Sequence, residues 1–142
     1  MRDARAAVAM CAGCNSRLAA RRITQFLDSH LADAGFGVAK FGLMAQIAAA
    51  GNDMLGALAQ RTGLDQSTLS RNLRNLEAEG LVEIAAVERD LRRRAVWLTE
   101  KGARRLEAAI PVWRRAHAAL SDLMDAKLAH SLASAAESLA AE

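Results

Sequence analysis

The stretch LGALAQRTGLDQSTLSRNLRNL, residues 55–76, contains two amphipathic segments joined through Thr62-Gly63. Glycine permits the backbone angle that a sharp turn between two helices needs, and the small Ala59 lets those helices approach closely. Asp65 is a suitable N-cap residue for the second segment. This order predicts a helix-turn-helix, whose second helix normally enters the major groove of DNA. The leucines expected between the two helices are Leu58, Leu64, Leu69 and Leu73.

The second helix should run to Glu79 and end at Gly80, a suitable C′ glycine. On the side that its leucines leave exposed, small polar groups lie beside long cations. Hydroxyls can approach phosphates or bases, glutamine can pair with adenine, and arginine can pair with guanine. Most polar helix faces are merely solvated, so the interpretation also depends on the segment that follows. The candidate DNA-binding residues of this helix are Gln66, Ser67, Thr68, Ser70, Arg71 and Arg74.

Two short segments rich in branched residues follow, at 81–87 and 95–99. The charged sequence ERDLRRR, residues 88–94, lies between them, so we predict a two-stranded hairpin with a charged loop. A hairpin directly after a recognition helix makes a winged helix. Arginines of such a wing can reach the phosphate backbone or the minor groove, which makes Arg92 and Arg94 candidate DNA-binding residues.

Helical patterns flank this region on both sides. Before it, the spacing of apolar residues predicts a helix over 5–34 with a break near Gly13, and a second helix over 38–50. A short helix over 54–61 should follow, with Asp53 as its N-cap.

After the hairpin, the pattern is helical from Glu100 to the C-terminus, and Pro111 should kink or split it. One stripe of this helix has more apolar surface than a small winged helix needs for itself, so we expect it to contact a second copy of the chain. The stripe consists of Leu106, Ile110, Trp113, His117, Leu120, Met124 and Leu128.

The segment LAQRTGLDQSTLSRNLRNLEAEGLVE, followed by DLRRRAVWLTEKG, resembles the MarR family of bacterial transcription regulators over roughly residues 38–107. Its most specific parts are the recognition helix and an Asp-x-Arg pattern that ends in Leu-Thr-x-x-Gly. The resemblance implies a homodimer of two winged helices, joined by interleaved N- and C-terminal helices. It also implies binding to a near-palindromic operator, commonly as a repressor, with release by a small molecule or by oxidation. The wing pattern is found here at Asp90, Arg92, Leu98, Thr99 and Gly102.

By motif position, the resemblance implies that Arg92 is the wing-tip arginine and that Asp90 orients the wing. Arg71 would be the recognition-helix arginine, whereas Asn75 stands where the family often has another arginine. The expected fold is mainly α with a small β-hairpin, as one compact domain. Its parts are an N-terminal dimerisation helix over 1–37, a winged helix-turn-helix over 38–100 and C-terminal dimerisation helices over 101–142.

Cys11 and Cys14 are three residues apart, so they would share a helix face. Such a pair can be inert packing, a redox site or half of a metal site, and all three remain open. The chain contains no tyrosine, which counts against the peroxide sensing that some members of the family perform with tyrosine-held cysteines.

His30, Trp113 and His117 lie on helical stripes, where core or interface packing is the ordinary role. They are also candidates for an effector pocket, because the family's pocket lies between the dimerisation helices and the winged helix. The expected ligand is a small organic molecule. No cofactor is expected for DNA binding, and no metal site is assigned.

Composition limits the other classes of function. The 142 residues are 52% apolar with a net charge of +3, as for one helical domain. The longest uncharged run, 41–52, is too short to cross a bilayer, and the apolar stretch AAVAM is too short for a secretory signal. We therefore expect a cytoplasmic protein without a membrane partner. No nucleophilic triad, carboxylate pair or phosphate-binding loop stands out, so an enzyme is not expected.

The sequence is interpreted as a homodimeric transcription regulator, a repressor, that binds double-stranded operator DNA. The alternative is a redox or metal sensor that acts through protein partners, with the winged helix as an interaction module. A small-molecule binding protein with a vestigial winged helix is less consistent with the joint presence of Arg71, Asp90 and Arg92.

Overall fold

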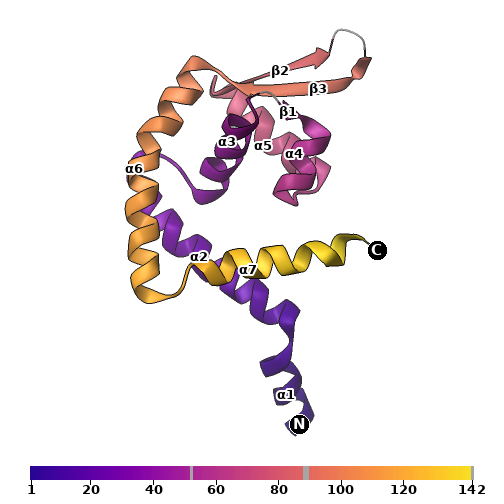
Figure 1. Ribbon diagram of the computed structural model, residues 1–142, viewed down its shortest axis with the longest axis vertical. Helices are drawn as coiled ribbons and strands as arrows, with labels where there is room; N and C mark the ends of the chain where they lie inside the picture. The colour runs from indigo at the N-terminus through magenta and orange to yellow at the C-terminus, as the bar shows by residue number, and fades with distance from the viewer. Residues whose placement is uncertain (52, 88–89, 142) are drawn as a thin grey trace.

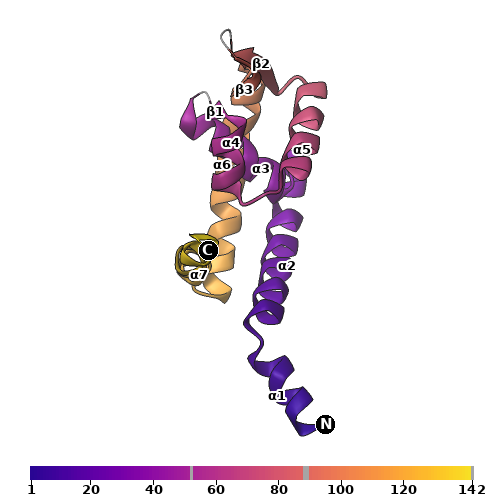
Figure 2. The same ribbon diagram turned by 90° about the vertical axis from the view of Figure 1, so that its right-hand side faces the viewer.

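Two long helices form the axis of the molecule. In the computed structural model, which describes residues 1–51, 53–87 and 90–141, α2 (Ala12–Leu31) packs against α6 (Glu100–Leu123). A small unit of helices and strands lies at one end of this pair, and the N-terminal helix α1 (Arg2–Met10) lies at the other (Figures 1 and 2). A short 3-10 helix, η1 (Ala32–Ala34), leads from α2 into the small unit.

The small unit is a helix-turn-helix with a three-stranded antiparallel sheet in the order β1-β3-β2. The central strand β3 pairs with β2 to form the predicted hairpin, in which Ile84 is opposite Val96. Figure 2 shows α5 and the sheet at the same end of the molecule. The elements are α3 (Val38–Ala50), β1 (Asp53–Met54), α4 (Leu55–Thr62), α5 (Gln66–Ala78), β2 (Val82–Val87) and β3 (Asp90–Leu98).

The core of this unit contains the leucines of the helix-turn-helix. Leu58, Leu69 and Leu73 are at most 1% exposed, and Leu64 packs against the same cluster while partly buried. The predicted set is therefore confirmed. Burial of each such side chain contributes about 1.5–3 kcal/mol, so these leucines hold α4 against α5. Other fully buried members are Leu31, Met44, Ile47, Val82 and Val96.

Both ends of α5 are fixed as the sequence predicted. Asp65 is its N-cap, and the carboxylate accepts the Thr68 backbone N–H at 2.9 Å. Gly80 has a φ of 70°, and its N–H donates to the carbonyl of Glu77 at 2.8 Å. The next N–H, of Leu81, donates to the carbonyl of Leu76 at 2.9 Å, which completes a Schellman motif.

The start of α6 is joined to the end of α5. The Thr99 hydroxyl accepts the Gly102 N–H at 3.0 Å and donates to the Gly80 carbonyl at 2.7 Å. A Cβ atom at Gly102 would lie 1.9 Å from the Leu81 carbonyl oxygen, so only glycine allows this contact. The Leu-Thr-x-x-Gly pattern therefore forms a tight joint between the recognition helix and α6.

The predicted β-structure was partly wrong. The second strand was expected over 95–99, but β3 begins at Asp90 and includes Arg92, Arg93 and Arg94 of the predicted loop, whereas Arg89 lies outside the described residues. The backbone ladder with β2 forms whatever the side chains are, so charge did not end the strand. The two-residue strand β1 was missed. It places Asp53 in the sheet, so the N-cap of α4 is Met54, without a side-chain cap.

The long C-terminal helix is not split at Pro111. The proline is exposed inside α6, while Ala109 and Ala116 on either side are buried, and their packing maintains the helix. The helix ends instead after Leu123. Most of its predicted interface stripe is used within the chain, because Leu106 and Leu120 are buried and Ile110 and Trp113 pack against the core. The N-terminal break lies at Cys11, two residues before the predicted position.

The terminal helices make few contacts with the rest of the chain. Within α7 (Lys127–Ala136) every side chain is exposed, and the 3-10 helix η2 (Glu137–Ala141) follows it. All the described side chains of α1 are exposed as well. Among the described residues, no helix has the length and apolar character needed to cross a membrane.

Candidate nucleic-acid interface

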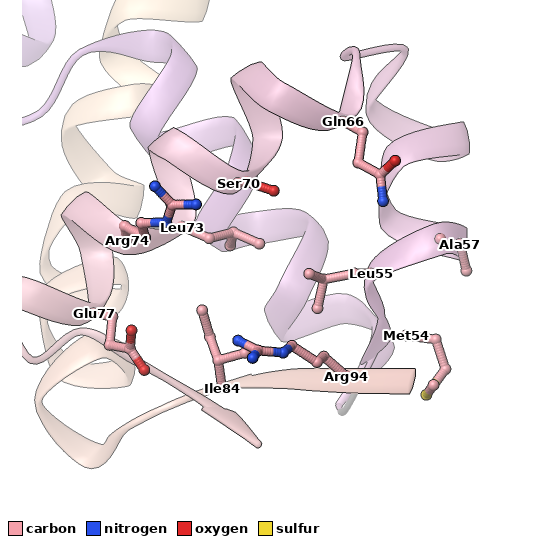
Figure 3. Close-up of a pocket in the computed structure, with 11 residues that line it drawn as sticks. Met54, Leu55, Ala57, Gln66, Ser70, Leu73, Arg74, Glu77, Ile84 and Arg94 are labelled. Carbon is pink, nitrogen blue, oxygen red and sulfur yellow. The ribbon is translucent and has the colours of Figure 1, made fainter. Parts of the chain in front are cut away.

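A groove of about 870 Å³ lies between α5, the beginning of α4 and the sheet (Figure 3). Side chains of α5 line one side, and Ile84 and Arg94 approach from the sheet on the other. Apart from the adjacent Leu73 and Arg74, successive members on α5 are three or four residues apart, so they lie along one side of the helix. The α5 residues of the groove are Gln66, Ser70, Leu73, Arg74 and Glu77.

The surface around this groove has several unpaired cations. Arg71, Arg74 and Arg94 are exposed, and none of them forms an ion pair with a described residue. Among the described side chains, Glu77 is the one acidic residue that lines the groove. The result is a cationic surface contributed by two separate elements, α5 and β3.

The N-terminus of α5 has its own hydrogen-bond network. The Asp65 carboxylate accepts the Ser67 hydroxyl at 2.6 Å and the Thr68 hydroxyl at 2.7 Å, besides the Thr68 N–H. These donors, with the Ser67 hydroxyl first, hold the pKa of Asp65 well below its ordinary value. Thr68 is thus used mainly to fix the first turn, whereas the Ser67 side chain is exposed beside it.

The structure brings four of the predicted DNA-binding residues together around the groove: Gln66, Ser70, Arg74 and Arg94. Ser67 and Arg71 are exposed on the adjoining outer face of α5. The backbone of Asp90 and Arg92 belongs to β3, but their side chains lie outside the described residues.

Sequence reasoning missed the contribution of β1 and the start of α4 to this surface. Met54, Leu55 and Ala57 line the groove opposite α5. They approach it because β1 pairs with β3, with Met54 opposite Ala95. A two-residue strand has no periodicity, so no local pattern could indicate it.

A second cleft, of about 590 Å³, lies between α2 and α6. His30 and Asp33 approach from one side, and Arg105 and Arg115 from the other. Neither guanidinium forms an ion pair with a described residue. Small side chains line the rest of the cleft, which leaves room between the helices: Ala34, Ala108, Ala109, Val112 and Ala116.

The other two effector candidates lie elsewhere. Trp113 stacks on Phe41 with ring centroids 5.7 Å apart, and His117 lies 4.4 Å from Trp113. This row packs α6 against α3 and does not line the cleft that contains His30. The structure therefore does not bring His30, Trp113 and His117 into one pocket.

The two cysteines lie at the junction of α1 and α2, far from the groove (Figure 1). Both are free thiols; Cys11 is half-buried and Cys14 is exposed. Within the described ranges, no cluster of three or more histidine, cysteine, aspartate or glutamate side chains could hold a metal ion.

Comparison with known proteins supplies an independent test of the fold. A family model described as MarR family matches residues 34–93. The transcriptional regulator MosR of M. tuberculosis, solved in complex with DNA, is similar with a TM-score of 0.82 and 30% identity, covering 92% of this chain and 97% of MosR. No curated protein matches the chain by sequence.

Two more distant structures share the fold. A variant of MarR from E. coli, complexed with operator DNA, has a TM-score of 0.78 at 21% identity, covering 94% of this chain and 96% of that one. PcaV of Streptomyces coelicolor, in complex with its natural ligand, has a TM-score of 0.77 at 17% identity and covers 94% of both chains. The family model and the similarity over nearly the whole of MosR lead to one conclusion: the chain belongs to the MarR family.

Proposed function

We propose that the protein is a transcription regulator that binds duplex DNA as a homodimer and represses transcription from a near-palindromic operator. The observation that carries the proposal is the groove between α5 and β3, which Arg74 and Arg94 line and beside which Arg71 is exposed. None of these three arginines forms an ion pair with a described residue. DNA-bound MosR supports the same assignment.

The proposed complex places the N-terminal half of α5 in the major groove. Gln66 and Arg71 then approach base edges, where glutamine pairs with adenine and arginine with guanine. Ser67, Ser70 and Arg74 are close enough to the same surface to contact bases or phosphates. The Asp65 network supports this geometry, because it fixes the turn from which these side chains project.

The hairpin supplies the second contact. Arg94 is exposed on β3 beside the groove, and Arg92 lies two residues closer to the tip of the hairpin. We assign both to the phosphate backbone or the minor groove, with Asp90 as the residue that orients the wing. Contacts of this kind add affinity with little dependence on sequence.

Exposed terminal helices support dimerisation. Leu128 and Leu132 of α7 are 61% and 54% exposed, and Met10 of α1 is 83% exposed. A helix of ten residues is marginal in water unless one face packs against a partner. A second copy of the chain, with its α1 and α7 packed between those of the first copy, would bury this apolar surface.

The salt dependence of DNA binding tests the proposal. Neutralised phosphates release counterions, so the affinity for duplex DNA should fall steeply as salt rises. Footprinting on the DNA upstream of the protein's own gene should reveal a near-palindromic protected site. An affinity that does not change with salt, or the absence of any protected site in that DNA and its surroundings, would contradict the proposal.

For the effector, we propose a small organic anion in the cleft between α2 and α6. Arg105 and Arg115 supply two positive charges there, and His30 adds a polar imidazole. The alanine-rich lining leaves room for a flat apolar body, and a guanidinium suits a carboxylate. This assignment retains His30 from the predicted set and leaves Trp113 and His117 as packing residues.

Calorimetric titration with aromatic carboxylates, of which benzoate is the simplest, tests the cleft. Arg105→Ala and Arg115→Ala should each weaken binding about tenfold or more, because charge-assisted hydrogen bonds are lost. Arg114→Ala, an exposed arginine outside the cleft, is the matched control. Equal affinities of all three variants for benzoate would show that the anion binds elsewhere. Benzyl alcohol, which is neutral, should bind more weakly than benzoate, and equal affinity would show that the cleft does not recognise the carboxylate.

A further inference from the structure

The C-terminal end of α5 is held by lysines from two other helices. The chain contains 16 arginines but three lysines, and two of the three, Lys40 of α3 and Lys101 of α6, bind Glu79. Glu79 is the C-cap residue of α5. Neither lysine lines the groove between α5 and the sheet, so the contacts proposed above for DNA give them no role.

Lys101 binds a backbone group that the helix itself leaves open. Its Nζ donates to the Glu79 carbonyl oxygen at 2.6 Å. The last carbonyls of a helix have no partner within it and form the negative end of its dipole, so an ammonium group is favourable there on both counts. A Cβ atom added at Gly80 would lie 3.8 Å from this Nζ, which places the ammonium beside the turn that ends α5.

Lys40 contacts the side chain of the same residue. Its Nζ lies 2.5 Å from Oε2 of Glu79 and 5.6 Å from the centroid of the Phe36 ring. Phe36 is buried, and an ammonium within about 6 Å of an aromatic centroid is attracted to the ring. The Lys40 side chain is 26% exposed, so its ammonium has two partners and little freedom to leave them.

This ion pair spans a place where α3 and α5 do not pack closely. A cavity of about 220 Å³ lies between the two helices, and both Lys40 and Glu79 line it. Apolar packing therefore leaves the separation of the helices loosely fixed at this point, and the ion pair bridges the gap. The remaining lining residues are Ala39, Leu43, Asn72, Asn75 and Leu76.

We propose that Lys40 and Lys101 are positioning residues of the recognition helix, which hold the end of α5 and so sharpen its discrimination between the operator and other duplexes without touching DNA. The inference rests on the proposed DNA binding by α5. Hydrogen bonds to base edges need side chains held within about 0.5 Å of their productive positions. Attraction to phosphates is independent of sequence and needs no such accuracy. Loss of either lysine therefore weakens specific binding more than non-specific binding.

A stabilising role and a direct DNA contact predict different results. An exposed ion pair contributes little to stability, so every variant should remain folded well below the melting temperature. A lysine that contacts a phosphate would, when removed, reduce the salt slope of DNA binding by about one unit. A positioning residue leaves that slope unchanged and lowers the preference for the operator.

Fluorescence anisotropy compares the operator defined by footprinting with a scrambled duplex of the same length. Lys40→Met and Lys101→Met should each lower the ratio of operator affinity to scrambled affinity about two- to fivefold, with the salt slope unchanged. Lys40→Arg and Lys101→Arg retain a cationic donor and should keep the wild-type ratio. Lys127→Met removes the same charge from an exposed lysine of α7 and is the matched control.

A double-mutant cycle tests the ion pair itself. Glu79→Ala should lower the specificity ratio as much as Lys40→Met does. The double variant should lower it no further, because both changes remove one interaction. Additive losses would show that Lys40 acts through some partner other than Glu79.

Hydrogen exchange without DNA separates this inference from the proposed function. The Gly80 and Leu81 N–H groups close the turn at the end of α5, so they should exchange faster in Lys40→Met and Lys101→Met than in Lys127→Met. Unchanged exchange, a lower salt slope, or the specificity ratio of Lys127→Met would overturn the positioning role and leave the proposed DNA binding intact. A wild-type protein that prefers no duplex would refute the proposed function, and the role in specificity with it, whatever the exchange rates.

Discussion

Asp65 links the fold of α5 to its proposed function, since three hydrogen bonds converge on its carboxylate at the start of the recognition helix. The pKa of Asp65 is lowered in the folded protein, mainly by the Ser67 and Thr68 hydroxyls. A lowered folded pKa stabilises the protein fully above the ordinary aspartate pKa of about 4, and this contribution is lost as the pH falls below it.

The free energy of unfolding should therefore decrease between about pH 4 and pH 2 by more in wild type than in Asp65→Asn, which has no carboxylate to protonate there. Urea unfolding at each pH measures the difference. Asp122→Asn removes an exposed carboxylate that accepts no hydrogen bond from a described residue, so it should retain the wild-type difference. The same pH dependence in wild type and Asp65→Asn would assign the acid sensitivity to other groups.

Arg71 and Arg92 should contribute to DNA binding in different ways. Arg71→Ala should weaken binding to the specific operator by about 1–3 kcal/mol, because a base contact is lost. Arg92→Ala should weaken specific and non-specific duplexes alike and reduce the salt slope by about one unit. Fluorescence anisotropy on both duplexes measures these effects, and Arg104→Ala, which is exposed on α6, is the control. An Arg71→Ala protein with wild-type operator affinity would show that another face of α5 contacts the bases.

For single residues, the sequence was most informative where a residue type is strongly preferred for one backbone geometry. Gly63 and Gly80 have φ values of 66° and 70°, and Asp65 caps a helix as its side chain prefers. The role of Thr68 was harder to predict, because a hydroxyl in the first helical turn can face a partner or its own N-cap. Only the coordinates show that it donates to Asp65.

Among the elements, the joint between the end of α5 and the start of α6 has no room for a larger side chain at Gly102. Gly102→Ala places a methyl group 1.9 Å from the Leu81 carbonyl oxygen, so either the backbone or the start of α6 must move. We expect a loss of stability of about 1–3 kcal/mol or more, as for other overpacked sites. Gly42→Ala is a matched control, because a Cβ atom there meets nothing within 4 Å in the middle of α3. It should raise stability by about 0.5–1 kcal/mol. Thermal unfolding of both variants tests the contrast, and equal effects would disprove it.

The type of element could be predicted where apolar residues follow helical spacing over a long segment, as in α2, α5 and α6. The extent of β3 could not be predicted, because pairing with β2 extends it to Arg94 and Asp90, and β1 adds a second partner at Ala95 and Val96. These are long-range pairings with no local signal. A split of the helix at Pro111 was also wrongly predicted, since α6 continues through the proline with Ala109 and Ala116 buried on either side of it.

For the whole molecule, α7 should hold the dimer together. Leu128→Ser with Leu132→Ser removes its exposed apolar face and should shift the protein toward monomer at micromolar concentration, with weaker operator binding. His130→Ser with Lys127→Ser changes the opposite side of the same helix and serves as the control. Sedimentation velocity distinguishes them. A wild-type protein that is monomeric at this concentration with full operator affinity would exclude the homodimer, as would a double leucine variant that dimerises normally.

The symmetry of that dimer sets the operator. Two α5 helices related by a two-fold axis should contact half-sites about one turn of DNA apart, roughly 34–36 Å. In an operator with an added half-turn between the half-sites, the two α5 helices of one dimer should no longer bind both half-sites simultaneously. Footprinting would show this as protection of a single half-site. Equal protection of both half-sites at both spacings would mean that the two winged helices bind DNA independently, which would contradict the fixed spacing.

The Thr99–Gly102 joint turns α6 into a lever. With 24 residues and a rise of about 1.5 Å each, the helix is about 36 Å long. A tilt of about 10° at its far end, where α7 begins, displaces the joint by about 6 Å, which is half the width of a major groove of about 12 Å. Because the Thr99 hydrogen bond and the close contact at Gly102 fix α6 against the end of α5, the recognition helix must move with that displacement. A change too small to alter the fold at one end of the molecule can therefore determine whether the other end still fits its DNA.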